Sequence, residues 1–394
     1  MEGTVDIKAI RDQIPITQSI TYMNTGWTCP VFTPVAEAIR SQIQFEMEQG
    51  AATLAGIARS EEALARLRQA LASFFNAGVE ELMPTQNTTA GLNMVAGGLA
   101  WREGDGLVTC SLEHPSVLGM AHGLRNRFGV NLRIVQLNSL DDTETILAKF
   151  DEAIIPGTRL VAISHVQYSC GLRMPVEEII SLAHQRGAQV VLDGAQAAGQ
   201  MAVDLTTMGV DYYSMPGQKW LLGPGGTGVL YVRQNLIADL QPVAGSYRSV
   251  ASWEADGTVT FKDQALEKLL AGTASTALQC GLEAGVGILA GLGMAAVEQR
   301  HLALSNRMKD RLAAMPGVQL TCPVDPARSS GLVTIAVGGI EPSDFVERLY
   351  REDDIAIRAV LHPDGVRLCT AFFNTEDEID EAADAVKRVL DTMQ

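Results

Sequence analysis

The chain has 394 residues, of which 47% are hydrophobic and 19% charged, and its formal net charge at pH 7 is −16. This length exceeds the usual size of one domain, so two domains are expected, and the composition excludes a disordered chain. The acidic balance leaves no basic stripe to neutralise phosphates, so neither nucleic acid nor an acidic membrane is an expected partner.

The cysteines and the N-terminal residues bear on compartment. Six cysteines are scattered without a CxxC pair, which is neither a zinc ribbon nor a disulfide scaffold and fits a reducing environment. Residues 1–15, MEGTVDIKAIRDQIP, contain acids and lack an apolar segment, so no signal peptide is predicted. No uncharged apolar run of about 18 residues occurs, so no membrane span is predicted. A cytoplasmic globular protein without a metal centre is expected.

From about residue 60, helical and strand patterns alternate along the chain. Apolar residues at helical spacing predict helices at 61–75, 89–100, 116–128, 143–151 and 175–187. Apolar runs predict strands at 106–110, 132–137, 159–166, 188–196 and 229–233. The helix at 89–100 is expected to be capped by Thr88 and Thr89. Near-continuous apolar strands between helices predict a mostly parallel sheet covered on both faces.

After about residue 230 the pattern changes to that of a smaller α+β unit. Residues 275–315 form a long, largely helical stretch. Beyond it we predict, in order, a strand at 331–337, a helix at 342–352, strands near 354–360 and 366–373, and a helix at 376–393. The boundary between the two units is expected near residues 260–275.

Polar residues follow the apolar strands, where open α/β sheets bind ligands. Asp193 closes the strand QVVLD, and His114 follows VTCSLE. Thr88 and Thr89 stand at a helix start, where free N–H groups and the helix dipole favour a phosphate. Each has an ordinary structural alternative: a turn or helix cap for the acid and the threonines, and a packing role for the histidine.

One further residue, Lys219, lies in the glycine-rich stretch SMPGQKWLLGPGGTG. Taken alone it would be a surface lysine, and the GxGxxG in this stretch precedes a strand, so it lacks the helix that a dinucleotide loop needs. Combined with a buried acid, a phosphate cradle and a histidine, however, such a lysine is what pyridoxal 5'-phosphate (PLP) requires. The lysine forms a Schiff base with the aldehyde, and the acid pairs with the pyridinium nitrogen.

The segment VVLDGAQAAGQMAVDLTTMGVDYYSMPGQKWLLGPGGTGVLYV resembles the fold-type I, class V PLP enzymes, which include cysteine desulfurases, cysteine/cystine C–S lyases and isopenicillin-N epimerase-like proteins. TYMNTGWTCP, TQNTTAGLN, LEHPS and VRLCTAFFNTEDEID resemble that family's substrate loop, phosphate loop, ring-stacking histidine and substrate-arginine segment. The resemblance implies an α/β, fold type I architecture with a mostly parallel seven-stranded sheet flanked by helices. The expected domains are a large PLP-binding domain at 22–270 and a small α+β domain formed by 1–21 and 271–394, with a linking helix at about 276–298.

The resemblance also implies the roles of individual residues. Lys219 is expected to form the Schiff base and act as the base at Cα, with Asp193 at the ring nitrogen and His114 stacked on the ring as the other catalytic residues. The expected cofactor-binding residues are Thr88, Thr89, His114, Ser169, Asp193, Gln196, Ser214, Gln218, Lys219 and Thr273. The expected substrate-binding residues are Asn24, Thr25, Trp27, Arg358 and Arg367.

Three of these roles are specific. Gln196 is expected to bond the phenolic oxygen of the ring, and Thr273 to reach the phosphate in the neighbouring subunit of a homodimer. Arg367 is expected to clamp the substrate carboxylate through two parallel hydrogen bonds.

The chain departs from the family at several positions. Gln218 and Pro216 replace a histidine and a hydroxyl residue, so one phosphate contact is altered, and Ser214 could replace it only through a rebuilt turn. Ser169 stands where desulfurases and lyases commonly have asparagine and is closer to the epimerase-like relatives. The segment AVLHPDG lacks the cysteine with which desulfurases form a persulfide, so a sulfur relay is not expected; Cys170 and Cys369 are expected to be packed in the core.

The expected function is that of a PLP-dependent lyase that cleaves the C–S bond of cysteine, cystine or a cysteine S-conjugate by α,β-elimination. Its products would be pyruvate, ammonia and a sulfur compound, and no nucleophile on the enzyme is needed. An amino-acid epimerase or racemase, a class V aminotransferase and a non-catalytic binding module of the same fold are the open alternatives.

Overall fold

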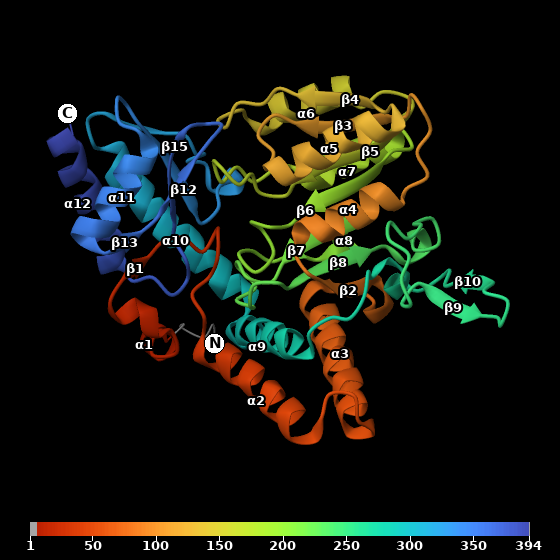
Figure 1. Cartoon of the computed structure of the whole chain (residues 1–394). Helices are drawn as coiled ribbons and strands as arrows, with labels where there is room; N and C mark the ends of the chain where they lie inside the picture. The colour runs from red at the N-terminus through yellow and green to blue at the C-terminus, as the bar shows by residue number, and fades with distance from the viewer. Residues whose placement is uncertain (1–5, 394) are drawn as a thin grey trace.

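The computed structural model describes residues 6–393 of the chain. Its large unit is built on a seven-stranded sheet in the order β2-β8-β7-β6-β5-β3-β4 (Figure 1). The strands are β2 (Leu82–Thr85), β3 (Gly106–Cys110), β4 (Asn131–Val135), β5 (Thr158–Ser164), β6 (Gln189–Asp193), β7 (Tyr212–Pro216) and β8 (Gly228–Val232). Six strands run in one direction, and β8 alone runs opposite to them. The predicted α/β fold with a mostly parallel seven-stranded sheet is confirmed.

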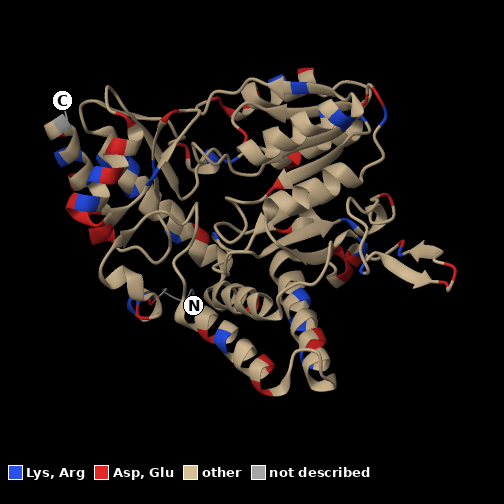
Figure 2. Ribbon diagram, viewed as in Figure 1, with Lys and Arg blue, Asp and Glu red and all other residues tan. Residues whose placement is uncertain are grey.

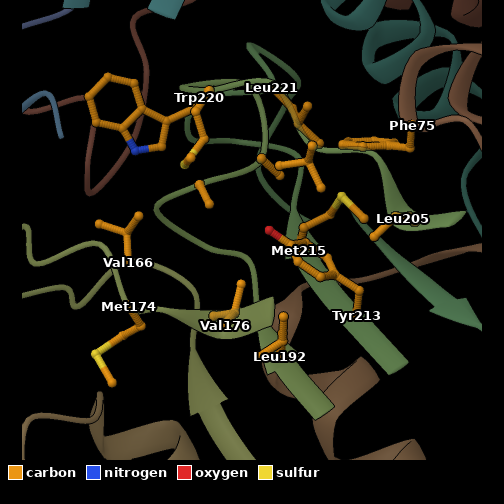
Figure 3. Packing of buried hydrophobic residues seen from close by; sticks show 14 of the residues in the cluster. Phe75, Val166, Met174, Val176, Leu192, Leu205, Tyr213, Met215, Trp220 and Leu221 are labelled. Carbon is orange, nitrogen blue, oxygen red and sulfur yellow. The ribbon is translucent and has the colours of Figure 1, made fainter. Parts of the chain in front are cut away.

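Helices cover both faces of this sheet, as its apolar strands require. They are α2 (Thr33–Gln49), α3 (Leu54–Phe75), α4 (Thr88–Gly98), α5 (Pro115–Phe128), α6 (Thr143–Ala153), α7 (Val176–Gln185) and α8 (Leu205–Met208). Consecutive strand residues belong to different hydrophobic clusters: Leu160 packs in one and Val161 in the other, and Val191 and Leu192 alternate in the same way. Figure 3 shows part of one cluster, in which Leu192, Tyr213 and Met215 come from β6 and β7. The period of two residues therefore builds two cores, one on each face.

The start of α4 differs from the prediction. Its N-cap is Asn87, whose side-chain oxygen accepts a hydrogen bond from the Ala90 N–H at 2.8 Å, and Thr88 and Thr89 are the first two helical residues. The predicted capping by the threonines is wrong, because Asn87 is the extended residue from which a side chain can reach back to the third N–H of the helix. The hydroxyl groups of Thr88 and Thr89 therefore do not cap the helix.

The small unit contains a four-stranded antiparallel sheet in the order β11 (Val318–Leu320), β12 (Leu332–Val337), β15 (Gly365–Cys369) and β14 (Arg358–Val360). The helices α10 (Met294–Ala313), α11 (Pro342–Asp353) and α12 (Glu376–Met393) belong to it. Acidic and basic residues alternate on these helices (Figure 2), and Arg307 of α10 pairs with Asp380 of α12.

The N-terminal segment joins this unit, because β1 (Thr21–Tyr22) pairs in parallel with β13 (Ile355–Ala356). Residues 1–5 of the segment assigned to the small domain, which also belong to the stretch predicted not to be a signal peptide, lie outside the described residues.

The helical stretch predicted at 275–315 is two helices. The first is α9 (Thr276–Leu292), and it meets α10 at Gly293 with a bend of 83°. Gly293 has φ 80°, a backbone conformation that only glycine adopts readily, so the expected linking helix at 276–298 is interrupted there. In the described part of the chain no single helix is long and apolar enough to cross a membrane; only α9 and α10 taken together, across their bend, have the length and composition.

A two-stranded hairpin projects from the large unit (Figure 1). It consists of β9 (Val250–Trp253) and β10 (Val259–Phe261), and the side chains of Trp253 and Phe261 are exposed. No pattern in the sequence predicted this hairpin.

Candidate active site

A cavity of about 240 Å³ lies where β5, β6 and β7 end and α4 begins. Most of the predicted site residues line it, from both units of the chain: Trp27, Thr88, Thr89, His114, Asp193, Gln196, Gln218, Lys219, Arg358 and Arg367. Five predicted residues do not line it: Asn24, Thr25, Ser169, Ser214 and Thr273. Residues that the sequence analysis did not assign also contribute, among them Asn87, Ser116, Ser164 and Tyr168.

Lys219 and Asp193 face the same cavity. Asp193 ends β6, and its Oδ1 accepts a hydrogen bond from the Ala195 N–H at 2.8 Å. Burial lowers the pKa of Lys219 to about 8, opposed by the Asp193 carboxylate and assisted by Arg367 and Arg358. Burial likewise raises the pKa of Asp193, opposed by Lys219. The lysine therefore loses its proton more readily than an ordinary lysine, and it shares one cavity with a carboxylate.

His114 is held in one orientation at the start of α5. The Ser116 N–H donates to its Nδ1 at 3.2 Å, so the ring proton of the neutral imidazole is on Nε2. The imidazole packs edge-to-face on Tyr168 with ring centroids 4.9 Å apart. Burial, followed by the charge of Lys219, lowers the pKa of His114 to about 4, so the ring is neutral at pH 7 and offers a flat, uncharged face.

The first turn of α4 forms one end of the cavity. Asn87, Thr88 and Thr89 line it there, and the Thr89 hydroxyl donates to Ser116 Oγ at 3.0 Å. Free N–H groups and the positive end of the helix dipole favour a phosphate at this point. Gln218 also lines the cavity, and its Oε1 is buried without a hydrogen-bond partner among the described residues.

Ser214 does not reach this phosphate end. It is fully buried, and its hydroxyl donates to the Thr88 carbonyl oxygen at 2.9 Å from beneath the helix. A Cβ added to Gly91 would lie 2.2 Å from Ser214 Oγ, so β7 and α4 pack closely at this point. The prediction that Ser214 binds the cofactor is therefore corrected: it positions the helix start from below.

Two arginines form the other end of the cavity. Arg358 of β14 and Arg367 of β15 are opposite each other in the sheet register. Arg367 is 2% exposed and donates from Nη1 to the Tyr168 carbonyl oxygen at 2.6 Å, while its Nε has no partner within residues 6–393. The Arg358 guanidinium lies 3.6 Å from the centroid of the Trp27 ring. Two adjacent, partly desolvated cations with free donors favour a carboxylate ligand.

The other predicted residues lie around the cavity. Asn24 Oδ1 and Thr25 Oγ1 are buried without partners in the described chain, within the loop that places Trp27. The Ser169 hydroxyl donates to the His362 carbonyl oxygen at 2.9 Å, so it holds the β14–β15 loop and does not face the ring position. Thr273 is exposed and lines a separate hollow with Thr85.

A buried carboxylate below the cavity was missed. Glu113 accepts hydrogen bonds from the Ser164 N–H and hydroxyl and from Gln167 Nε2, at 2.9, 2.5 and 2.8 Å. It fixes Ser164, which lines the cavity. In the sequence Glu113 is simply an acid next to His114, and no pattern distinguishes a buried, hydrogen-bonded glutamate from an exposed one at this position.

The arrangement fits PLP. An anion site at a helix start, a lysine with a lowered pKa, a carboxylate and a flat imidazole surround one cavity, and Gln218 and Arg367, which also line it, each have a buried polar atom without a partner among the described residues. The fold and the site thus define a PLP-dependent enzyme of fold type I.

Comparison with known proteins gives the family. Residues 22–381 match the model of the family "Aminotransferase class-V", and the chain belongs to this family of PLP-dependent enzymes. A cysteine desulfurase of Escherichia coli is 32% identical over 377 residues, which cover 90% of each chain.

Solved structures give the same result. A cystine C–S lyase in complex with its reaction product cysteine persulfide matches with TM-score 0.89 and 28% identity, over 96% of this chain and 99% of the lyase. A variant of that lyase contains glycine covalently linked to the PLP cofactor. Cysteine desulfurase from Thermococcus onnurineus matches with TM-score 0.90 and 26% identity over 100% of both chains. These relatives of the chain are therefore enzymes named for chemistry on the C–S bonds of cysteine and cystine.

Proposed function

We propose that this enzyme is a PLP-dependent lyase that cleaves the C–S bond of cysteine, cystine or a cysteine S-conjugate by α,β-elimination. Cystine and water would yield pyruvate, ammonia and cysteine persulfide, and cysteine and water would yield pyruvate, ammonia and hydrogen sulfide. In both reactions the C–S electron pair leaves with the sulfur, and no oxidant or reductant is consumed.

PLP, when bound, supplies the electron sink that makes the Cα proton of the amino acid acidic. The residues of the chain do the rest. The uncharged amine of Lys219 accepts the Cα proton at Nζ, and Asp193 stabilises a proton on the ring nitrogen through its negative charge. Arg367, assisted by Arg358, binds the α-carboxylate through its unpaired Nε–H and so orients the Cα–H bond.

The observation that supports elimination over sulfur transfer is the lack of a thiol at the cavity. No described residue that lines it is a cysteine, and Cys170 and Cys369 are fully buried. The loop between β14 and β15 contains no cysteine and is tied down, since Tyr168 and Ser169 donate to the carbonyl oxygens of Leu361 and His362. With no enzyme thiol to take the sulfur, it leaves on the product.

The carbon product distinguishes elimination from sulfur transfer. Purified holoenzyme incubated with cystine or cysteine is expected to release pyruvate and ammonia in equal amounts, and a desulfurase would release alanine from cysteine. Pyruvate should be lost in Lys219→Ala and retained in Cys280→Ser, which changes the one cysteine that is not buried. Alanine as the main product, or no turnover of cysteine, cystine or a set of cysteine S-conjugates, would refute the lyase assignment.

We further propose that the enzyme acts as a homodimer in which Thr273 completes the neighbouring phosphate site. Thr273 lies on an exposed segment and does not line the cavity of its own chain. The projecting hairpin also exposes two large apolar side chains, Trp253 and Phe261. Light scattering should give twice the 42.2 kDa chain mass. Thr273→Ala should weaken PLP binding without changing that mass, and a monomer that retains full activity would exclude the arrangement.

A further inference from the structure

The side-chain amide of Gln196 has two fixed partners. The Trp220 indole N–H donates to Gln196 Oε1 at 2.9 Å. Gln196 Nε2 donates to the Gly26 carbonyl oxygen at 2.8 Å. All of this lies in the interior, where Gln196 and Trp220 are each 2% exposed.

These partners allow only one orientation of the amide. An indole N–H can only donate, so the atom facing Trp220 must be the amide oxygen, and a backbone carbonyl can only accept, so the atom facing Gly26 must be the nitrogen. The nitrogen has a second hydrogen, which no hydrogen bond among residues 6–393 uses. Since Gln196 lines the cavity, this hydrogen is the polar group that it offers to a ligand.

Trp220 is itself rigidly held. Its ring packs edge-to-face on His301 with centroids 5.2 Å apart, and it lies in the core cluster drawn in Figure 3. His301 donates its Nδ1–H to the Gln200 carbonyl oxygen at 2.8 Å, and Gln200 Nε2 donates to the Gln196 carbonyl oxygen at 2.9 Å. Burial lowers the pKa of His301 to about 4, so the imidazole that packs on the Trp220 ring is neutral at pH 7.

We propose that Trp220 is a positioning residue, which fixes the Gln196 amide so that its free N–H points at the anionic ring oxygen of the bound cofactor. Without the indole donor the amide can turn, and its oxygen then presents an acceptor to an anion, which is repulsive. The same orientation holds Gly26 and hence the loop that carries Trp27. This role rests on the proposed PLP chemistry. The sequence analysis assigned no role to Trp220, although it directly follows Lys219.

The test is a pH titration of the visible absorbance of the PLP-loaded enzyme. A hydrogen-bond donor stabilises the ring oxygen most when the loaded cofactor has lost its dissociable proton, so loss of the donor raises the apparent pKa of that titration. Trp220→Phe keeps the aromatic packing and removes the N–H. We expect a rise of about half a unit to one unit, the size of effect that the loss of one typical hydrogen bond produces.

A double-variant cycle separates positioning from packing. If Trp220 acts through the amide, Trp220→Phe combined with Gln196→Leu should titrate like Gln196→Leu alone; additive shifts, or an unshifted Trp220→Phe, would overturn the proposal. Trp101→Phe is the matched control, because it removes an indole hydrogen bond to the Ala96 carbonyl oxygen away from the cavity and should leave the titration unchanged.

A second measurement does not depend on the Trp220 variant loading the cofactor. In ¹⁵N-labelled protein with four tryptophans, substitutions of Trp27, Trp101 and Trp253 assign the fourth indole signal to Trp220. That signal should shift and exchange faster with solvent in Gln196→Leu, and an unchanged signal would contradict the hydrogen bond. If the wild-type enzyme shows no PLP absorbance at all, the proposed function fails, whereas a response to Gln196→Leu without one to Trp220→Phe removes only this inference.

Discussion

The lowered pKa of Lys219 gives a prediction about cofactor uptake. Only a neutral amine attacks the aldehyde of PLP, so the rate at which apo-enzyme takes up PLP should rise with pH and level off near the pKa of this lysine. Burial together with Arg367 and Arg358 sets that pKa at about 8, compared with the ordinary 10.5. At pH 7 the neutral fraction is then about 300-fold larger than for an unperturbed lysine, which follows from the ratio of the two ionisation constants.

The charges around the lysine provide variants with opposite signs. Arg358→Gln removes a cation that lowers the pKa of Lys219, so the pH at which uptake levels off should move up by about half a unit to one unit. Asp193→Asn removes the carboxylate that opposes the lowering, so this pH should move down by a similar amount. Neither shift depends on the absolute rate, which both variants also change.

Stopped-flow absorbance of apo-enzyme mixed with PLP measures these rates. The reaction of PLP with a blocked free lysine at each pH corrects for protonation of PLP itself. Lys219→Ala should show no covalent phase. A wild-type rate that continues to rise to pH 10, or a shift in the same direction for Arg358→Gln and Asp193→Asn, would refute the electrostatic account.

Three further predictions concern the ends of the cavity. Arg367→Lys should raise the KM for cystine by about 10- to 100-fold with a smaller change in kcat, as steady-state kinetics would show, because an ammonium cannot make two parallel hydrogen bonds. Trp27→Leu should raise the KM a few-fold without lowering the melting temperature, because this ring stacks on Arg358 yet is 54% exposed. Gly91→Ala should destabilise the fold by about 1–3 kcal/mol in urea and weaken PLP binding, since its Cβ would lie 2.2 Å from Ser214 Oγ, and Ser214→Ala should restore part of both.

The sheet was predictable because its strands are buried on both faces and therefore form continuous apolar runs between helices. The two strands of this sheet that were not predicted contain proline: β2 includes Pro84 and β7 ends at Pro216. The sheet tolerates Pro84 because β2 is an edge strand, where a residue without an N–H need not interrupt the hydrogen bonds between strands. The hairpin β9–β10 has an exposed surface on each strand, so no core imposed an alternating pattern on its sequence.

Residues of the candidate site were predictable where they lie at the end of an apolar strand, as Asp193 does, or in a short motif, as Lys219 does. They were not predictable where a contact joins distant segments. Arg367 donates to the Tyr168 carbonyl oxygen across 199 residues of sequence, and Gln196 donates to Gly26 across 170. The Ser214 prediction was wrong for a local reason, since residues of a strand alternate between faces and Ser214 faces the underside of α4.

The two arginines and the loop between them connect the architecture to the chemistry. Arg358 and Arg367, which both line the cavity, are paired in register on β14 and β15, and a short connection joins these two strands. In this chain it is Leu361 to Asp364, held to Tyr168 and Ser169 by two hydrogen bonds of 3.2 and 2.9 Å. Tyr168 in turn packs on His114, and its carbonyl oxygen accepts from Arg367, so the loop is connected through Tyr168 to two residues that line the cavity. A loop used in this way stabilises the substrate site, and it is poorly suited to swing a nucleophile toward the sulfur. The proposed elimination, in which the sulfur leaves on the product, needs no such movement of this loop.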